Sequence, residues 1–266
     1  MLNTALYKRG LLSSLKLLGI FCAVFALYFP VVLSMFDPEL GKALAELSES
    51  MPELMAMFGM GSTPADLLGF IGNYLYGMIM LVFPMVFTIM TANRLVAWHT
   101  DRGSMACLLA APVKRRTVVL SQITVLLTGL LILVVFAAGL GWILAEVSYL
   151  GQLDAGGYAL LNLGVLCLQL FIAGLCFLCS CIFNDTRNSL ALGAGISTLA
   201  YLLQMLASAG KVLADLRYLT FFTLFNPEKI AAGERGAMTG PLILLGGAII
   251  LFTAAVIVFQ KKDLPV

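Results

Sequence analysis

Few side chains in this sequence are of the types that carry catalysis. There is one histidine, His99, so neither a metal site with two imidazole ligands nor a Ser/His/Asp triad can be assembled from this chain alone. Gly210-Lys211-Val212 has the glycine and lysine of a phosphate loop, but it lacks the upstream glycine and the Ser or Thr that should follow the lysine. We therefore expect no catalytic group, no nucleotide site and no cofactor bound by this chain.

Methionines are the first of two groups of sulfur-bearing residues that could bind a metal. Met55, Met57 and Met60 carry soft thioethers that could bind Cu(I), although no His or Cys lies nearby to complete the site. The same segment, 51–60, has apolar residues at helical spacing, and methionine is also a flexible filler of apolar gaps. Copper binding and packing on the outer leaflet or on a partner subunit therefore both stay open.

Cysteines form the second group. Cys176 and Cys179 would share one face of a helix, whereas Cys181 would point away, and no histidine lies near them in sequence. This pattern favours small buried thiols between helices over a zinc or redox site.

The composition shows which solvent the fold faces. Hydrophobic residues make up 61% of the 266 residues and charged residues 11%, against about 25% charged in soluble domains, and the mean hydropathy is +1.01. The net charge of +2 is too small to indicate a nucleic-acid partner. Six runs without charge are each long enough to cross the roughly 30 Å hydrocarbon core as a helix: 17–36, 67–93, 117–145, 155–183, 188–210 and 236–260. The sequence therefore predicts an all-α integral membrane protein with one transmembrane domain, 1–266.

The loops between these runs divide by charge. One set (the N-terminal arm, 94–116, 185–187 and the C-terminal tail) holds eleven of the sixteen Lys and Arg and three acids, and the other set holds five basic residues and eleven acids. Because basic loops stay in the cytoplasm, we expect both termini and 94–116 there. The arm 1–16 should form an interfacial amphipathic helix. The aromatic outer segment 211–235 should form short interfacial or re-entrant helices.

Uncharged polar residues within the runs are candidates for a translocation path. Such side chains usually face the bundle interior or a cavity, because lipid cannot hydrogen-bond them. They could equally join one helix to another, and Asn162 and Gln169, seven residues apart on one face, are expected to make contacts of this kind. The path candidates are Asn73, Tyr74, Tyr76, Thr88, Tyr201 and Gln204.

The stretch 98–117 is the longest polar interruption among the basic loops. Thr100 could cap a short helix, and Met105, Leu108 and Leu109 would then form one apolar stripe on it. Pro112 would end the helix, since it lacks a backbone N–H. The spacing fits a docking helix, and a solvated loop that only sets topology is the alternative.

These residues resemble a known family. Asp101-Arg102-Gly103-Ser104, Leu108-Leu109 and Pro112-Val113-Lys114-Arg115 are similar to the coupling-helix pattern of the permease subunits of type-2 ATP-binding-cassette (ABC) exporters, with Asp for the usual Glu and Ser for the usual Thr. Phe225-Asn226-Pro227 and the end of the chain also resemble this family. The layout matches over nearly the whole chain, and the motifs cover about twenty residues.

The resemblance implies a plasma-membrane exporter subunit that pairs with a second permease copy or a related partner. It implies separate cytoplasmic ATPase subunits, which bind ATP and Mg²⁺, and it leaves peptide, lipid, drug and ion open as substrates. It assigns ATPase coupling to Asp101, Arg102, Gly103, Met105, Leu108, Leu109, Pro112 and Arg115. A secondary transporter is the alternative, but the six runs lack the charged residues that ion coupling normally needs. A membrane-embedded assembly protein is a further alternative.

Overall fold

The structure, a computed structural model, describes residues 3–36, 50–51, 66–101, 114–209 and 211–261. Six stretches in this part of the chain are helical, long enough and apolar enough to cross a membrane, as the sequence predicts. The long helices are α1 (Thr4–Ser34), α5 (Met80–Leu95), α8 (Arg115–Ser148), α9 (Ala155–Ile182), α10 (Thr186–Ala209) and α12 (Thr239–Lys261). The second span also contains α4 (Leu67–Tyr74), the π-helical turn η1 (Leu75–Ile79) and α6 (Ala97–Asp101). The 3₁₀ helices η2 (Lys211–Leu219) and η3 (Phe221–Leu224) and the short α11 (Pro227–Ala231) connect α10 to α12.

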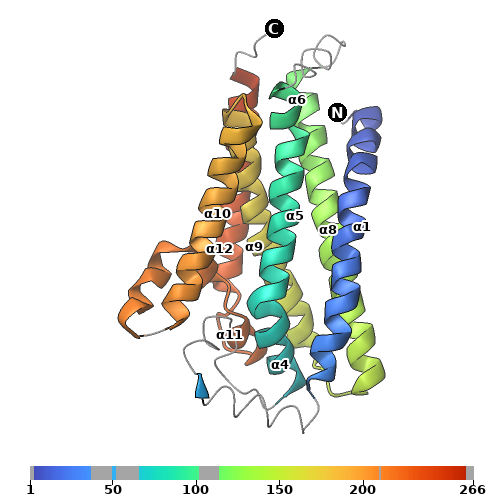
Figure 1. Cartoon of the computed structure of the whole chain (residues 1–266), viewed down its shortest axis with the longest axis vertical. Coiled ribbons are helices and arrows are strands. Elements are labelled where there is room, and N and C mark those ends of the chain that lie inside the picture. The colour runs from blue at the N-terminus through green and yellow to red at the C-terminus, as the bar shows by residue number, and fades with distance from the viewer. Residues whose placement is uncertain (1–2, 37–49, 52–65, 102–113, 210, 262–266) are drawn as a thin grey trace.

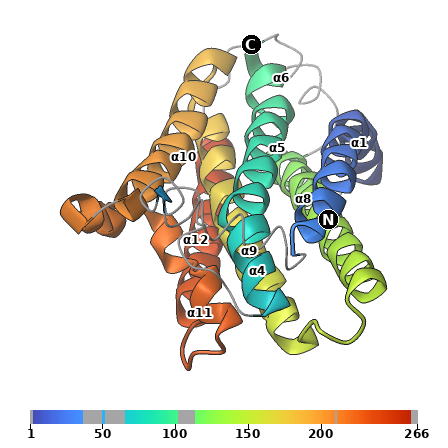
Figure 2. The ribbon, with the colours of Figure 1, turned by 60° about the horizontal axis from the view of Figure 1, so that its bottom comes forward.

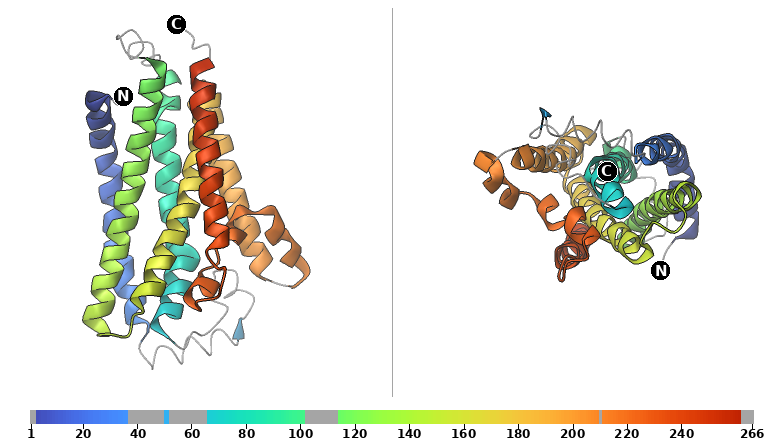
Figure 3. Two further views of the ribbon diagram at one scale, coloured as in Figure 1. Left: turned by 180° about the vertical axis from the view of Figure 1, so that it is seen from behind. Right: turned by 90° about the horizontal axis from the view of Figure 1, so that it is seen from below.

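The second and fourth spans lie at the centre of the bundle. In the most apolar part of each, 67% of the residues are buried, against 22% in α10 and α12. Viewed from behind, α12 lies along α9 and α8 lies along α1 (Figure 3). The two central spans therefore supply most of the core, and the outer helices present apolar residues to lipid.

The N-terminal arm differs from its prediction. No separate interfacial helix is seen, because α1 is continuous from Thr4 and spans about 46 Å at 1.5 Å per residue. Asn3 caps its start by accepting hydrogen bonds from two backbone N–H groups. The backbone N–H of Asn3 donates to Ser121 Oγ (3.1 Å), and the Tyr7 hydroxyl donates to Thr128 Oγ1 (3.3 Å). The arm therefore packs on α8.

The two ends of the bundle carry different loops. The N-terminal end of α1, the whole of α6 and the C-terminal end of α12 lie at one end, and α4 begins at the other (Figure 1). Turning that second end forward shows α11 beside α4 (Figure 2). Each pair of crossings returns the chain to the end from which it started. The helix ends that flank the basic loops therefore lie together at one end of the bundle, in agreement with the predicted connectivity.

Glycines let α12 approach α9 closely. A Cβ placed on Gly247 would lie 2.8 Å from Cε2 of Phe171, whereas one placed on the neighbouring Gly246 would meet no atom within 4 Å. Contacts under 3 Å force a side chain or a helix to move. The two glycines therefore form a matched pair for testing this interface.

We expect Gly247→Ala to lower the free energy of unfolding by about 1–2 kcal/mol, because overpacking costs about 1–3 kcal/mol and the higher helix propensity of alanine offsets up to about 1 kcal/mol. Gly246→Ala should leave stability unchanged or slightly raised. Thermal unfolding of both purified variants in detergent measures the difference. Equal midpoints for the two variants would contradict the close contact.

Candidate functional site

The stretch 98–117 connects the second and third spans. Asp101 ends α6 and Arg115 begins α8. The other residues assigned to coupling (Arg102, Gly103, Met105, Leu108, Leu109 and Pro112) lie outside the described residues. The helix observed here begins at Ala97, so Thr100 lies within it and does not cap its start. The Thr100 hydroxyl instead donates to the Val96 carbonyl (3.2 Å).

The residues that join this stretch to the second span are buried. Val96 is 2% exposed and Ala97 is fully buried, and α6 contacts both α5 and α10. At Val96 the backbone leaves the helical region, with φ −122° and ψ −68°, which separates α6 from α5. On the other side, α8 runs without a break from Arg115 through the bundle (Figure 1). The stretch is therefore joined to α5 through the buried residues Val96 and Ala97 and is directly followed by α8.

The polar residues near the π-helical turn of the second span lie inside the protein. Tyr76 is fully buried, and its hydroxyl donates to Asn162 Oδ1 (2.7 Å). The amide nitrogen of Asn162 donates to the Tyr158 carbonyl, and the Tyr158 hydroxyl donates to the Ala138 carbonyl, each at 2.9 Å. This network joins the second, third and fourth spans. It favours the interpretation of Tyr76 and Asn162 as interhelical contacts.

The remaining path candidates of this span are also buried. Asn73 is 2% exposed, Tyr74 is 6% exposed and Thr88 is fully buried. None of them lines the cavity described below, and their part in a path stays a prediction.

Gln169 has a role that the sequence did not single out. Pro84 lies inside α5 and has no N–H to donate to the Met80 carbonyl four residues earlier. The Gln169 side-chain amide of α9 donates to that carbonyl (3.2 Å) and to the Leu81 carbonyl (2.9 Å). The π-helical turn η1 lies directly before this point. Gln169 therefore satisfies the backbone of a span that is irregular at two successive places.

Cys176 of α9 faces α10. Cys176 Sγ is 3.7 Å from the Gly193 carbonyl oxygen and 3.8 Å from Ser197 Oγ, and the hydroxyls of Ser180 and Ser189 are 3.0 Å apart. These contacts support the interpretation of Cys176 as a helix-packing thiol. Within the described ranges, no group of three or more His, Cys, Asp or Glu side chains could hold a metal ion. Met55, Met57 and Met60 lie outside those ranges.

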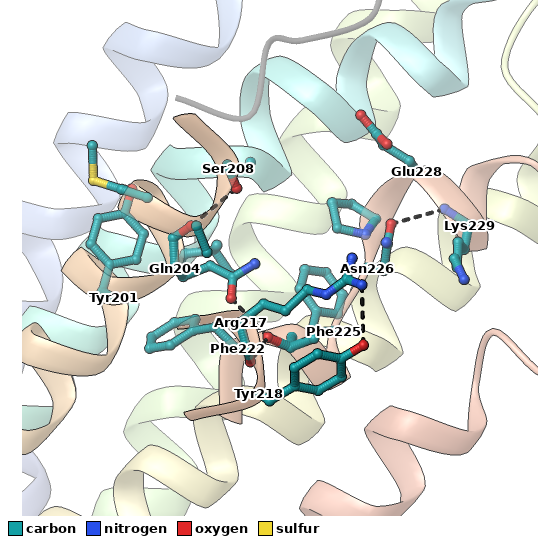
Figure 4. A pocket seen from close by; sticks show the side chains of 16 residues that line it. Tyr201, Gln204, Ser208, Arg217, Tyr218, Phe222, Phe225, Asn226, Glu228 and Lys229 are labelled. Atoms are coloured by element: carbon teal, nitrogen blue, oxygen red, sulfur yellow. Dashed lines mark hydrogen bonds between the residues drawn. The ribbon is translucent and has the colours of Figure 1, made fainter. Parts of the chain in front are cut away.

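A cavity of ≈ 610 Å³ opens at the end of the bundle opposite α6. Tyr201 and Gln204 of α10, which the sequence predicts as path residues, both line it (Figure 4). The short helices η2, η3 and α11, which fall where the sequence predicts outer helices, form much of the rest. The buried rings of Phe222 and Phe225 give the cavity an apolar wall, and Arg217 gives it a cationic group.

The sequence matches one family over almost its whole length. A family profile described as "ABC-2 family transporter protein" covers residues 9–264. Compared with curated proteins, the sequence gives no significant match. The six candidate membrane-spanning helices lie within or overlap the matched residues. The chain therefore belongs to the ABC-2 family, as the membrane-spanning permease component of an ABC transporter.

Proposed function

We propose that this chain is the permease of an ATP-driven exporter, in which two permease copies, or this chain and a related one, form the pathway. Separate cytoplasmic ATPase subunits bind ATP and Mg²⁺ and dock on the stretch 98–117. The observation that carries the proposal is the place of that stretch between α6 and α8, at the basic end of a bundle whose family is ABC-2.

The charge distribution supports the orientation in which both termini are cytoplasmic. The end of the bundle that holds α6 and both termini is the end with most of the Lys and Arg, including Arg94, Lys114, Arg115 and Arg116. Cytoplasmic loops are enriched in these residues. In this orientation the stretch 98–117 faces the compartment that holds ATP, and the cavity beside η2 faces outward.

The proposed coupling depends on how a movement of the ATPase subunits reaches the spans of the permease. ATP-driven closure of the ATPase subunits can change the permease only through an element that contacts both, and only by favouring one of two arrangements of the spans. The buried attachment of α6 makes the second span suited to receive such a displacement. A bundle of six spans is small, so a pathway shared between two copies is more plausible than one within a single copy.

The exit side of the pathway is assigned to the outer cavity. Tyr201 and Gln204 lie there, on α10, which is among the least buried helices of the bundle. A second copy that covered part of this helix would bring two such cavities close together.

We expect the full-length chain, tagged and purified from its native membrane, to bring with it an ATPase subunit that contains a phosphate loop. ATP turnover should be measurable in the complex and absent from the isolated chain. Mass spectrometry of the purified complex and a phosphate-release assay measure both. A complex without any nucleotide-binding subunit would contradict the proposal and favour a secondary transporter or an assembly protein.

A further inference from the structure

We propose that the outer cavity between α10, η2 and α11 binds an amphiphile with an anionic headgroup, a phosphate or a carboxylate. The inference rests on the proposed function only for the side of the membrane on which the cavity opens. Its volume of ≈ 610 Å³ is within the range of small-molecule sites, roughly 300–1,000 Å³. Figure 4 shows the polar groups of three separate elements gathered around it.

Arg217 of η2 is the main cationic group. Its guanidinium donates to the Tyr218 hydroxyl (3.1 Å) and lies 5.0 Å from the centre of that ring. In the part of the chain that the structure describes, it has no carboxylate partner within ion-pair distance. A guanidinium has five N–H donors arranged as a planar fork, which suits two oxygens of one phosphate or carboxylate.

One amide side chain of the lining has its oxygen already occupied. Asn226 Oδ1 accepts a hydrogen bond from the backbone N–H of Lys229 (3.1 Å). The NH₂ group of Asn226 then remains as a donor. With Arg217, the cavity therefore offers mainly donors, which a ligand rich in acceptors would satisfy.

The charges of the lining point to an anion. Arg217 and Lys229 line the cavity against one carboxylate, Glu228. The Glu228 carboxylate points away from the guanidinium of Arg217 (Figure 4). Lys229 forms an ion pair with Glu234 at 3.9 Å, but both side chains are more than half exposed, so this pair holds the lysine only weakly.

Another part of the lining is apolar and irregular. Phe222 and Phe225 are 2% and 4% exposed, and Leu81 and Met205 lie beside them in the lining. Gly77, which belongs to the π-helical turn η1, also lines the cavity, and π-helical turns are frequent at functional sites. A ligand with an anionic head and an alkyl chain matches both parts of the lining.

The test measures binding of octyl phosphate to the full-length chain in phosphatidylcholine nanodiscs, by equilibrium dialysis with empty nanodiscs subtracted. Arg217→Gln should weaken binding at least tenfold. Arg235→Gln removes the same charge from the same outer segment but does not line the cavity, so it should change binding less than twofold. Octyltrimethylammonium should bind at least tenfold more weakly than octyl phosphate.

Two supporting outcomes distinguish the source of the ligand. Enrichment of an anionic phospholipid in the purified chain, lost in Arg217→Gln, identifies a lipid headgroup. Binding of octyl phosphate without such enrichment identifies a substrate of the same chemistry. Equal weakening by both substitutions, or equal binding of the cationic amphiphile, overturns the proposal. The assay contains no ATPase subunit, so its failure would leave the exporter proposal standing, and failure of ATPase co-purification would not affect the result.

Discussion

Replacing Leu108 by aspartate should weaken ATPase association by about 100-fold or more while the permease stays folded in the membrane. Leu108 lies on the predicted apolar stripe of a short helix, outside every span. A carboxylate forced into an apolar contact must lose its water without gaining a partner, which costs on the order of several kcal/mol. At about 1.4 kcal/mol per tenfold change in affinity, this cost exceeds two orders of magnitude. Co-purification of the ATPase at matched permease expression measures the change.

Lys114→Ala is the control for this prediction. Lys114 is exposed at the start of α8, on the charged rim of the same stretch. Exposed ion pairs contribute only about 0–1 kcal/mol, so this substitution should reduce co-purification severalfold at most. If Leu108→Asp retained the ATPase and full ATP turnover, the stretch 98–117 would be a topology loop and coupling would have to occur elsewhere.

Gln169→Leu should lower the free energy of unfolding by about 1–3 kcal/mol. The substitution leaves the Met80 carbonyl without the donor that now satisfies it, whereas the Leu81 carbonyl keeps the helical position of the Met85 N–H, and an unsatisfied buried group costs about 1–3 kcal/mol. The loss is partly offset, because Gln169 Oε1 has no partner among the described residues and its removal relieves that cost. Thermal or denaturant unfolding of the purified chain in detergent measures the effect.

A double-mutant cycle with Pro84→Ala isolates the cause. Alanine at 84 restores a backbone N–H that can donate to the Met80 carbonyl, which lies four residues earlier in the helix. Gln169→Leu should therefore cost at least about 1 kcal/mol less in the Pro84→Ala background, which is a coupling well above the additivity error for sites of this kind. The same cost in both backgrounds would mean that Gln169 acts through its volume rather than through its amide.

The sequence predicted four of the six spans to within three residues at each end, but it missed how far the first span extends toward the N-terminus. Charge-free runs mark where a helix crosses hydrocarbon, because a charge is costly there. They do not mark where the helix ends. Nothing between Lys8 and Leu17 interrupts helix formation, so α1 continues to Thr4 and rests on α8. For the same reason α8 extends past Glu146 to Ser148.

The polar residues of the spans show why candidate path residues were harder to predict. Hydrogen bonding to another helix and exposure to a cavity impose the same requirement on a sequence, a polar side chain on the inward face. Tyr76 turned out to bond to Asn162, 86 residues away, whereas Tyr201 and Gln204 line a cavity. The need for a donor near Pro84 could be read from the sequence. The identity of that donor, Gln169, depended on how α9 packs against α5.

The π-helical turn Leu75–Ile79 also affects how related sequences should be aligned. A π-helical turn holds one residue more than the α-helical path that it replaces, so it rotates everything beyond it by about 100° about the helix axis. A relative that lacks this residue and is aligned on α5 without a gap would lose the register of the residues before the turn, in α4. Alignment of the second span should therefore allow a one-residue gap within 75–79. Reading through this point would shift the residues before the turn by one position, so that Asn73 would be compared with a residue about 100° away around the helix axis.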